Sequence, residues 1–166
     1  LLEANTEKYT SVYADRGKKG EPTRVSDGKG LVKCYEGAPV DKVKVYIPVF
    51  PGTNCDYDTA RAFERAGAEV DITVFKNLTG DDVLESIKEM KEHIAECHIM
   101  MLSGGFSAGD EPDGSGKFIA NVLNNKDVAD AIHALLDRGG LMLGICNGFQ
   151  ALVKPGLLPY GRMGKV

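Results

Sequence analysis

The segment LMLGICNGFQ, residues 141–150, decides the fold of this chain. Residues 141–145 are apolar apart from one glycine, so they predict a buried strand. A helix is predicted directly afterwards, over residues 147–153. The turn between them has the form Gly-x-Cys-x-Gly, which is the nucleophile-elbow arrangement with cysteine in place of serine. A strand that runs through a tight turn into a helix is typical of α/β proteins.

Cys146 is the candidate nucleophile because it stands at the apex of this turn. Gly144 and Gly148 permit a tight turn and a close approach of neighbouring backbone. The thiol lies at the start of the predicted helix, where the helix dipole favours the thiolate. The N–H of Asn147 would face an oxyanion formed on a substrate carbonyl. The alternative is an inert thiol buried after a core strand, but the glycines and the strand-to-helix context favour the nucleophile.

Outside this segment, the sequence from Val43 onward alternates between short apolar runs and helical spacings. Strands are predicted at residues 43–50, 70–75 and 97–102. Helices are predicted at residues 58–66, 81–94, 117–123 and 128–136, the first with Asp56 or Asp58 as its N-cap and Gly67 as its stop. The alternation with short connections predicts an α/β fold, with a doubly wound, mostly parallel sheet and helices on both faces.

Three loops follow the predicted strands, at residues 51–56, 104–116 and 146–148. They should meet at one edge, because the chemistry of such sheets sits at the carboxyl ends of the strands. Gly104 and Gly105 in the second loop let a backbone N–H approach a ligand, so this loop is a candidate source of a second oxyanion donor. Taken alone, the glycine pair would equally fit a flexible loop.

Three motifs of the sequence resemble those of one enzyme family. Residues 144–150 (GICNGFQ) resemble the nucleophile motif of class I, or triad, glutamine amidotransferases. Their Asn-Gly-x-Gln continuation is similar to the members that serve formylglycinamidine ribonucleotide synthesis. Residues 104–110 (GGFSAGD) resemble the oxyanion loop of that family, and residues 51–56 (PGTNCD) resemble its first strand-end loop. The resemblance covers residues 43–160.

The resemblance implies a flavodoxin-like fold and a defined reaction. Cys146 would attack the side-chain amide of L-glutamine, giving a glutamyl thioester and ammonia. The implied oxyanion and substrate residues are Gly104, Gly105, Phe106, Asn147, Gly148 and Gln150, with Asn54 in the rim loop. Ammonia would pass to a synthetase domain of the same parent polypeptide, which uses ATP and Mg²⁺ to make formylglycinamidine ribonucleotide in purine biosynthesis. No cofactor or metal is expected in the amidotransferase domain itself.

The sequence departs from the family pattern at several positions. Ala108 stands where many family members have tyrosine, and residues 110–114 are unusually acidic. The catalytic His-x-Glu pair of the family lies well downstream of the nucleophile, whereas no residue after Cys146 is His or Glu. We therefore expect residues 43–166 to be an incomplete amidotransferase domain with little glutaminase activity alone. We interpret residues 1–42 as a linker or the edge of a preceding synthetase region. Because the chain begins with leucine and not methionine, we expect it to be a piece excised from a longer polypeptide.

Composition excludes several classes of function. The net charge of −4 gives no basic footprint for nucleic acid, and the apolar runs are too short to span a membrane. The four cysteines match no metal motif, and a chain with this much core needs no disulfides, so we expect reduced thiols in a cytoplasmic protein. Cys34 is expected in the linker, Cys55 as a packed loop thiol and Cys97 as a core residue.

The histidines and acidic residues are not expected to form a catalytic or cation site. His93, His98 and His133 are not expected to be the catalytic base, because none follows the carboxyl end of a predicted strand. The acidic residues 110–113 fit a solvated loop better than a cation site. Two other functions stay open: a DJ-1-like cysteine-elbow protein, and a non-catalytic docking module on the synthetase.

Overall fold

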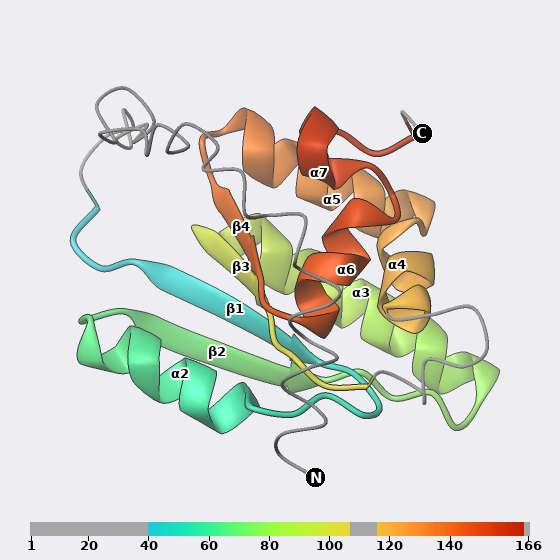
Figure 1. Cartoon of the computed structure of the whole chain (residues 1–166), viewed down its shortest axis with the longest axis horizontal. Coiled ribbons are helices and arrows are strands. Elements are labelled where there is room, and N and C mark those ends of the chain that lie inside the picture. Colours follow the sequence, from blue (N-terminus) through green and yellow to red (C-terminus); the bar gives the residue numbers. More distant parts are fainter. Residues whose placement is uncertain (1–39, 107–115, 165–166) are drawn as a thin grey trace, which may run out of the picture. The chain divides into compact units, whose positions relative to one another are not determined.

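The computed structural model describes residues 40–106 and 116–164 of the chain. Four strands form one parallel sheet in the spatial order β2-β1-β3-β4 (Figure 1). They are β1 (Lys44–Val49), β2 (Glu69–Val74), β3 (Ile99–Leu102) and β4 (Leu141–Gly144). Lys44 pairs with Glu69 at the start of β1 and β2, and Leu102 pairs with Gly144 at the end of β3 and β4. The predicted α/β fold with a parallel sheet is confirmed.

The strand order creates a switch point between β1 and β3. The chain moves outward from β1 to β2, then returns past β1 to β3 and continues to β4. This is the order of the first four strands of a flavodoxin-like sheet. Where the direction of winding reverses, the connections leave on opposite sides, and ligands bind in the crevice at the carboxyl ends of the strands. The loops after β1, β3 and β4 therefore converge at one edge of the sheet.

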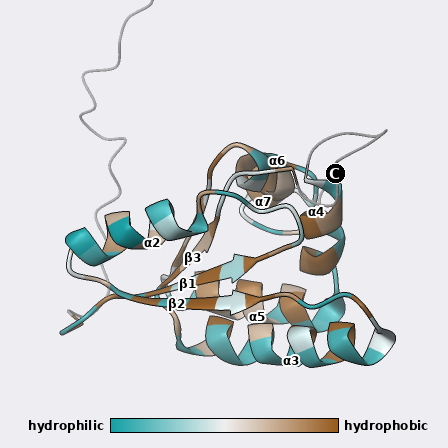
Figure 2. Ribbon diagram, turned by 90° about the horizontal axis from the view of Figure 1, so that it is seen from below, coloured by the Kyte–Doolittle hydropathy of each residue, from teal (hydrophilic) through white to brown (hydrophobic). Residues whose placement is uncertain are grey.

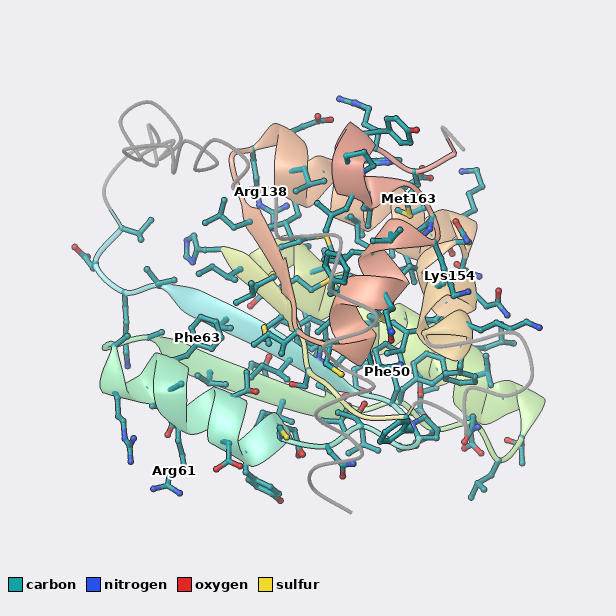
Figure 3. All side chains as sticks on the ribbon, in the orientation of Figure 1. Phe50, Arg61, Phe63, Arg138, Lys154 and Met163 are labelled. Carbon is teal, nitrogen blue, oxygen red and sulfur yellow. The ribbon has the colours of Figure 1, made fainter. Side chains whose placement is uncertain are left out.

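Helices lie on both faces of the sheet. They are α2 (Asp56–Arg65), α3 (Gly80–Glu96), α4 (Lys117–Leu123), α5 (Lys126–Asp137), α6 (Asn147–Val153) and α7 (Leu157–Tyr160). Figure 2 shows α2 on one side of β1 and β2, with α3 and α5 on the other. Phe63 of α2 is directed toward the sheet and Arg61 away from it (Figure 3). This arrangement follows from the amphipathic spacing of α2, which turns one apolar stripe to the strands.

Two apolar clusters fill the space on either side of the sheet. The smaller lies under α2 and contains Val45, Ile47, Ala60 and Met101. The larger lies on the opposite face, where side chains of α3, α4, α5 and α6 pack on the alternate residues of the strands, among them Tyr46, Met100 and Leu102. Because successive side chains of a strand point to opposite faces, each buried strand supplies both clusters.

Several predicted element ends need correction. Cys55, not Asp56 or Asp58, occupies the N-cap of α2, and it makes no side-chain capping bond. Both aspartates lie in the first turn, where their charge complements the helix dipole. Strand β3 begins at Ile99 rather than Cys97, because α3 runs to Glu96 and Cys97 caps it by donating its N–H to His93 O. The short helix α7 was not predicted.

Strand β4 is partly buried on one face and exposed on the other, although a fully buried strand was predicted. Its register with β3 places Leu143 beside Met101, on the face that α2 covers. On that face Leu141, Leu143 and Ile145 are 54%, 44% and 52% exposed. The physical reason is that α2 packs on β1 and β2, and none of the other described helices covers β4 on that side.

None of the helices in the described ranges is both long and apolar enough to cross a bilayer. The predicted linker at residues 1–42 lies, apart from residues 40–42, outside the described residues, so its boundary stays a prediction. Cys34, Ala108 and the acidic residues 110–114 also lie outside the described residues, so the expectations for them stay predictions.

Candidate active site

Cys146 stands on a strained turn between β4 and α6. Its backbone has φ 53° and ψ −108°, a conformation that residues other than glycine rarely adopt. The turn is closed by Gly148 N–H donating to Ile145 O at 2.9 Å, and Gln150 N–H donates to Cys146 O at 3.1 Å. The thiol is free and exposed. Strain of this kind is typical of a nucleophile held at the top of an α/β sheet.

The two glycines of the elbow are required by close backbone contacts. A Cβ on Gly148 would lie 2.1 Å from Leu102 O, and one on Gly144 would lie 2.6 Å from Gly148 C and O. Contacts this short leave no space for a side chain. Helix α6 therefore packs directly on the ends of β3 and β4, and this packing fixes where Cys146 stands.

The glycine pair after β3 lies beside the nucleophile. A Cβ on Gly104 would be 3.4 Å from Cys146 Cβ. On its other side this segment pairs with the loop after β1, through an isolated antiparallel bridge between Thr53 and Gly105. Asn54 N–H donates to Gly104 O at 2.8 Å. The loop after β1, residues 104–106 after β3 and the elbow after β4 thus come together at the carboxyl ends of the strands (Figure 1).

The remaining predicted site residues surround this point with different exposures. Phe106 is 70% exposed at the end of the described part of its loop, and Asn147 is 2% exposed at the start of α6. Gln150 and Asn54 are exposed, and Gly148 is buried under the elbow. Phe106 and Gln150 therefore reach solvent at the rim, whereas the side chain of Asn147 is buried.

Cys55 differs from its prediction as a packed loop thiol. Its side chain is exposed and its backbone is left-handed, with φ 64° and ψ 17°. The left-handed N-cap lets the chain turn sharply from the rim loop into α2, and it directs the side chain outward rather than into the core. A cysteine in this conformation gives no sequence signal, because left-handed residues are normally glycine or asparagine.

Two further residues of the rim escape sequence reasoning. Thr53 Oγ1 accepts the N–H of Phe50 at 3.0 Å, which closes the turn after β1. Ser103 is 3% exposed, and its Oγ has no hydrogen-bond partner among the described residues. A short polar residue before Gly-Gly or after Pro-Gly indicates only a loop. The hydrogen bond of Thr53 and the burial of Ser103 therefore cannot be predicted without the fold.

All three histidines of the chain are engaged away from the elbow. His93 pairs with Asp71 and stacks on Tyr46, with ring centroids 5.1 Å apart. His98 lies at the amino end of β3, where its Nδ1 accepts the N–H of Lys44 at 2.9 Å. His133 of α5 accepts the N–H of Met163 on Nε2 at 3.2 Å. That none of the three is the catalytic base stays a prediction.

A surface cavity lies at the opposite end of the sheet, at the amino ends of β1 and β2. Its lining includes Tyr46, Asp71, His93 and Cys97. Burial raises the pKa of the Cys97 thiol to about 11 and also raises the pKa of Tyr46. The raised pKa values keep the Cys97 thiol and the Tyr46 phenol protonated at neutral pH, and the Asp71 side chain pairs with His93, so we interpret this cavity as structural. The described residues contain no cluster of three or more metal-ligating side chains.

Comparison with known proteins identifies the family of this chain. Residues 42–165 match the family described as the CobB/CobQ-like glutamine amidotransferase domain. The chain is 42% identical over 120 residues to phosphoribosylformylglycinamidine synthase subunit PurQ of Dehalococcoides mccartyi, which covers 72% of this chain and 43% of that protein. It is 40% identical over 114 residues to the same subunit of Methanococcus maripaludis, covering 69% and 38%.

A solved structure agrees with the sequence relatives. The structure of PurLQS from Thermotoga maritima matches with a TM-score of 0.50 at 32% identity, covering 70% of this chain and 46% of that chain. The chain thus spans less than half the length of the relatives it matches. The family match supports the amidotransferase interpretation over the DJ-1-like alternative. The chain belongs to the CobB/CobQ-like glutamine amidotransferase domains, and among them it is similar to the PurQ subunits of phosphoribosylformylglycinamidine synthase.

Proposed function

We propose that this chain is a glutamine-hydrolysing part of a phosphoribosylformylglycinamidine synthase and that Cys146 is its nucleophile. The observation that carries the proposal is the elbow itself. Cys146 is exposed and has a positive φ between a strand and a helix, and the Gly104–Gly105 segment packs beside it. The similarity to PurQ subunits supports the choice of acceptor reaction.

The proposed chemistry is acyl transfer through a thioester. The Cys146 sulfur attacks the side-chain amide carbon of L-glutamine, and the carbonyl oxygen becomes an oxyanion. Collapse of this intermediate breaks the C–N bond, and the nitrogen takes a proton and leaves as ammonia. Water then hydrolyses the glutamyl thioester to glutamate. Backbone N–H groups of Gly105 and Asn147 are the proposed oxyanion donors, because donors held where charge develops lower the barrier most.

A thiol nucleophile also needs a base and a group that orients the base. The three histidines of the 166 residues are held at the amino end of β3, in α3 and in α5. The base of the proposed reaction is therefore expected outside these residues, and this chain alone should turn over glutamine at close to the background rate. A purely docking role for the chain alone is the competing interpretation.

The proposed acceptor of ammonia is a synthetase partner that uses ATP and Mg²⁺ to convert formylglycinamide ribonucleotide to the amidine. The structure of PurLQS from Thermotoga maritima contains a chain similar to this one, which supports such a partner. We place the reaction in the cytoplasm. The free thiols of Cys55, Cys97 and Cys146 fit a reducing compartment.

A glutaminase assay with and without added sequence tests the proposal. The chain alone, and the chain fused to the part of the Dehalococcoides mccartyi PurQ that the match does not cover, are given L-glutamine, and glutamate release is measured. We expect activity in the fusion only. Cys146→Ser should abolish it, and Cys55→Ser, the matched exposed cysteine, should retain it.

A diazoketone analogue of glutamine gives an independent readout in the same fusion. Its adduct should appear on the Cys146 peptide by mass spectrometry. Labelling of a different cysteine, or glutamine turnover that survives Cys146→Ser, would show that the nucleophile is wrongly assigned. A fusion that folds, shows no turnover and forms no adduct would favour the docking interpretation.

A further inference from the structure

We propose that Thr53 is a positioning residue of the oxyanion hole. Its hydroxyl closes the turn after β1, and this turn holds the Gly104–Gly105 peptide so that the N–H of Gly105 is directed to the side on which Cys146 lies. The inference rests on the proposed function, because it concerns the oxyanion of that reaction. Thr53 itself touches no reacting atom in this scheme and acts through the backbone it holds.

The turn after β1 is closed by two hydrogen bonds between Phe50 and Thr53. Thr53 N–H donates to Phe50 O at 2.9 Å, and Phe50 N–H donates to Thr53 Oγ1 at 3.0 Å. Pro51 and Gly52 occupy the central positions, and Gly52 has φ 85°, as a tight turn with glycine third requires. The backbone bond alone would define the turn, and the hydroxyl adds the bond that satisfies the N–H of the buried Phe50.

This turn is tied to the glycine segment by bonds on both sides of Gly105. Asn54 N–H donates to Gly104 O at 2.8 Å, and Phe106 N–H donates to Gly52 O at 2.9 Å. A Cβ on Gly105, whose φ is 143°, would lie 2.3 Å from Gly52 O. The segment therefore lies directly against the turn, and any shift of the turn is passed to the Gly104–Gly105 peptide.

The direction of the Gly105 N–H follows from the geometry of the peptide. The Gly104–Gly105 bond is trans, and in a trans peptide the C=O and the N–H point in opposite directions. Asn54 holds the Gly104 oxygen on the side of the β1 loop, so the N–H of Gly105 points away from that loop. Because β3 lies between β1 and β4, the opposite side is that of the elbow, where Cys146 Cβ is 3.4 Å from a Cβ on Gly104.

Two electrophiles separate this role from a merely structural one. Acylation of a thiol by 4-nitrophenyl acetate passes through a tetrahedral oxyanion before 4-nitrophenolate leaves. Alkylation by iodoacetamide displaces iodide at a saturated carbon and forms no oxyanion. Neither reaction needs a base from outside the chain, since the leaving groups are good. The ratio of the two rates at the Cys146 peptide, followed by mass spectrometry on the full chain, therefore reports the oxyanion donors.

Thr53→Val keeps the shape of the side chain and removes the hydroxyl acceptor. We expect the acylation rate at Cys146 to fall by about tenfold, less than the 10²–10³ seen when an oxyanion donor is removed outright. The alkylation rate should change by less than about twofold, because the elbow is untouched. Thr53→Ser retains the hydroxyl and should restore the ratio. If the valine variant does not fold, Thr53→Ala takes its place.

Thr59→Val is the matched control. The Thr59 hydroxyl donates to Cys55 O at 2.6 Å next to the same rim, but it has no bond to the glycine segment, so the rate ratio should not change. Equal slowing of both reactions in Thr53→Val would overturn the inference, because the elbow would then be disturbed. If Thr53→Val leaves the acylation rate unchanged and Cys146→Ser abolishes acylation, the inference is overturned while the proposed nucleophile stands. A rate ratio in the unsubstituted chain equal to that of a small free thiol would overturn the oxyanion hole and this inference together.

Discussion

Backbone strain and close contacts concentrate at the residues of the rim. Cys55 and Cys146 are the described residues other than glycine with positive φ, and both stand where a strand-end loop enters a helix. Such conformations cost free energy and persist where the surrounding structure holds them. At Cys146 the surrounding structure includes Gly144 and Gly148, so substitutions at these glycines should report on the elbow directly.

Gly148→Ala should destabilise the fold, because its Cβ would lie 2.1 Å from Leu102 O and α6 would have to move off β3. We expect a loss of about 1–3 kcal/mol in the free energy of unfolding, measured by urea denaturation. Gly80→Ala is the control, since a Cβ there meets no atom within 4 Å, and it should change stability by less than about 0.5 kcal/mol. Equal denaturation midpoints for the two variants would contradict the close packing.

The buried thiol of Cys97 should make stability fall at alkaline pH. Burial raises its pKa from 9.0 to about 11, so between these values the folded state keeps a proton that the unfolded state has lost. The corresponding stability is present below pH 9 and is lost as the pH rises toward 11. The free energy of unfolding should therefore decline less steeply over this interval in Cys97→Ala than in the unsubstituted chain. Equal slopes for Cys97→Ala and for the unsubstituted chain would refute the effect.

Among the elements, α3 shows how distant residues complete a local structure. Its beginning is local, because Thr79 Oγ1 accepts the N–H of Asp82 at 3.1 Å, and the Asp82 side chain accepts the N–H of Thr79 at 2.9 Å. Its end is not. Arg138, which follows α5 and is labelled in Figure 3, donates Nη2 to Ile94 O at 2.5 Å and to Cys97 O at 2.9 Å.

Arg138→Ala should therefore weaken the packing of α3 on α5. The two carbonyl oxygens would lose a charged donor in a partly buried place, and we expect a loss of about 2 kcal/mol in the free energy of unfolding. Arg138→Lys should recover part of it, since an ammonium lacks the planar fork of guanidinium. Arg162→Ala is the control: its pair with Asp137 at 2.7 Å is exposed, so its loss should cost less than about 1 kcal/mol. Similar losses for Arg138→Ala and Arg162→Ala in urea denaturation would argue against the cap.

Helix and strand positions along the chain agree with the sequence, whereas several ends do not. The apolar spacing of residues 81–94 and the β-branched run at 43–50 are local patterns, and they predicted α3 and β1 to within a few residues. The N-cap at Cys55 and the late start of β3 depend on loops and caps. Element ends are set by which partner takes the last backbone groups, and spacing alone does not contain that information.

At the scale of the whole molecule, β4 leaves apolar surface and a sheet edge uncovered among the described residues. It ends the strand order, and Leu141, Leu143 and Ile145 are about half exposed on the face that α2 covers elsewhere. An unpaired edge with apolar side chains promotes association. We expect sedimentation velocity of the chain to show association that rises with protein concentration.

Leu143→Lys should reduce this association without unfolding the chain, because it places a charge at the centre of the exposed strip. Leu84→Lys, at a 67% exposed position on α3, should leave it unchanged. The same sedimentation coefficient at every concentration, in the unsubstituted chain and in both variants, would mean that the β4 surface does not self-associate.

The sequence by itself determined the α/β class, the order of the elements and the cysteine elbow. These follow from periodicity and from short motifs, because the residues that decide them lie within a few positions of each other. The placement of the three rim loops at one edge followed as well, since parallel strands bring their carboxyl ends together.

The tertiary structure alone decided which backbone and side-chain groups meet at that edge and which surfaces stay open. The hydroxyl of Thr53, the direction of the Gly105 N–H and the exposure of Cys55 and Leu143 depend on contacts between residues far apart in the chain. A local pattern predicts that a residue is in a loop or a strand. It does not predict the partner of a hydrogen bond or the helix that covers a strand, because those are fixed only when the sheet assembles.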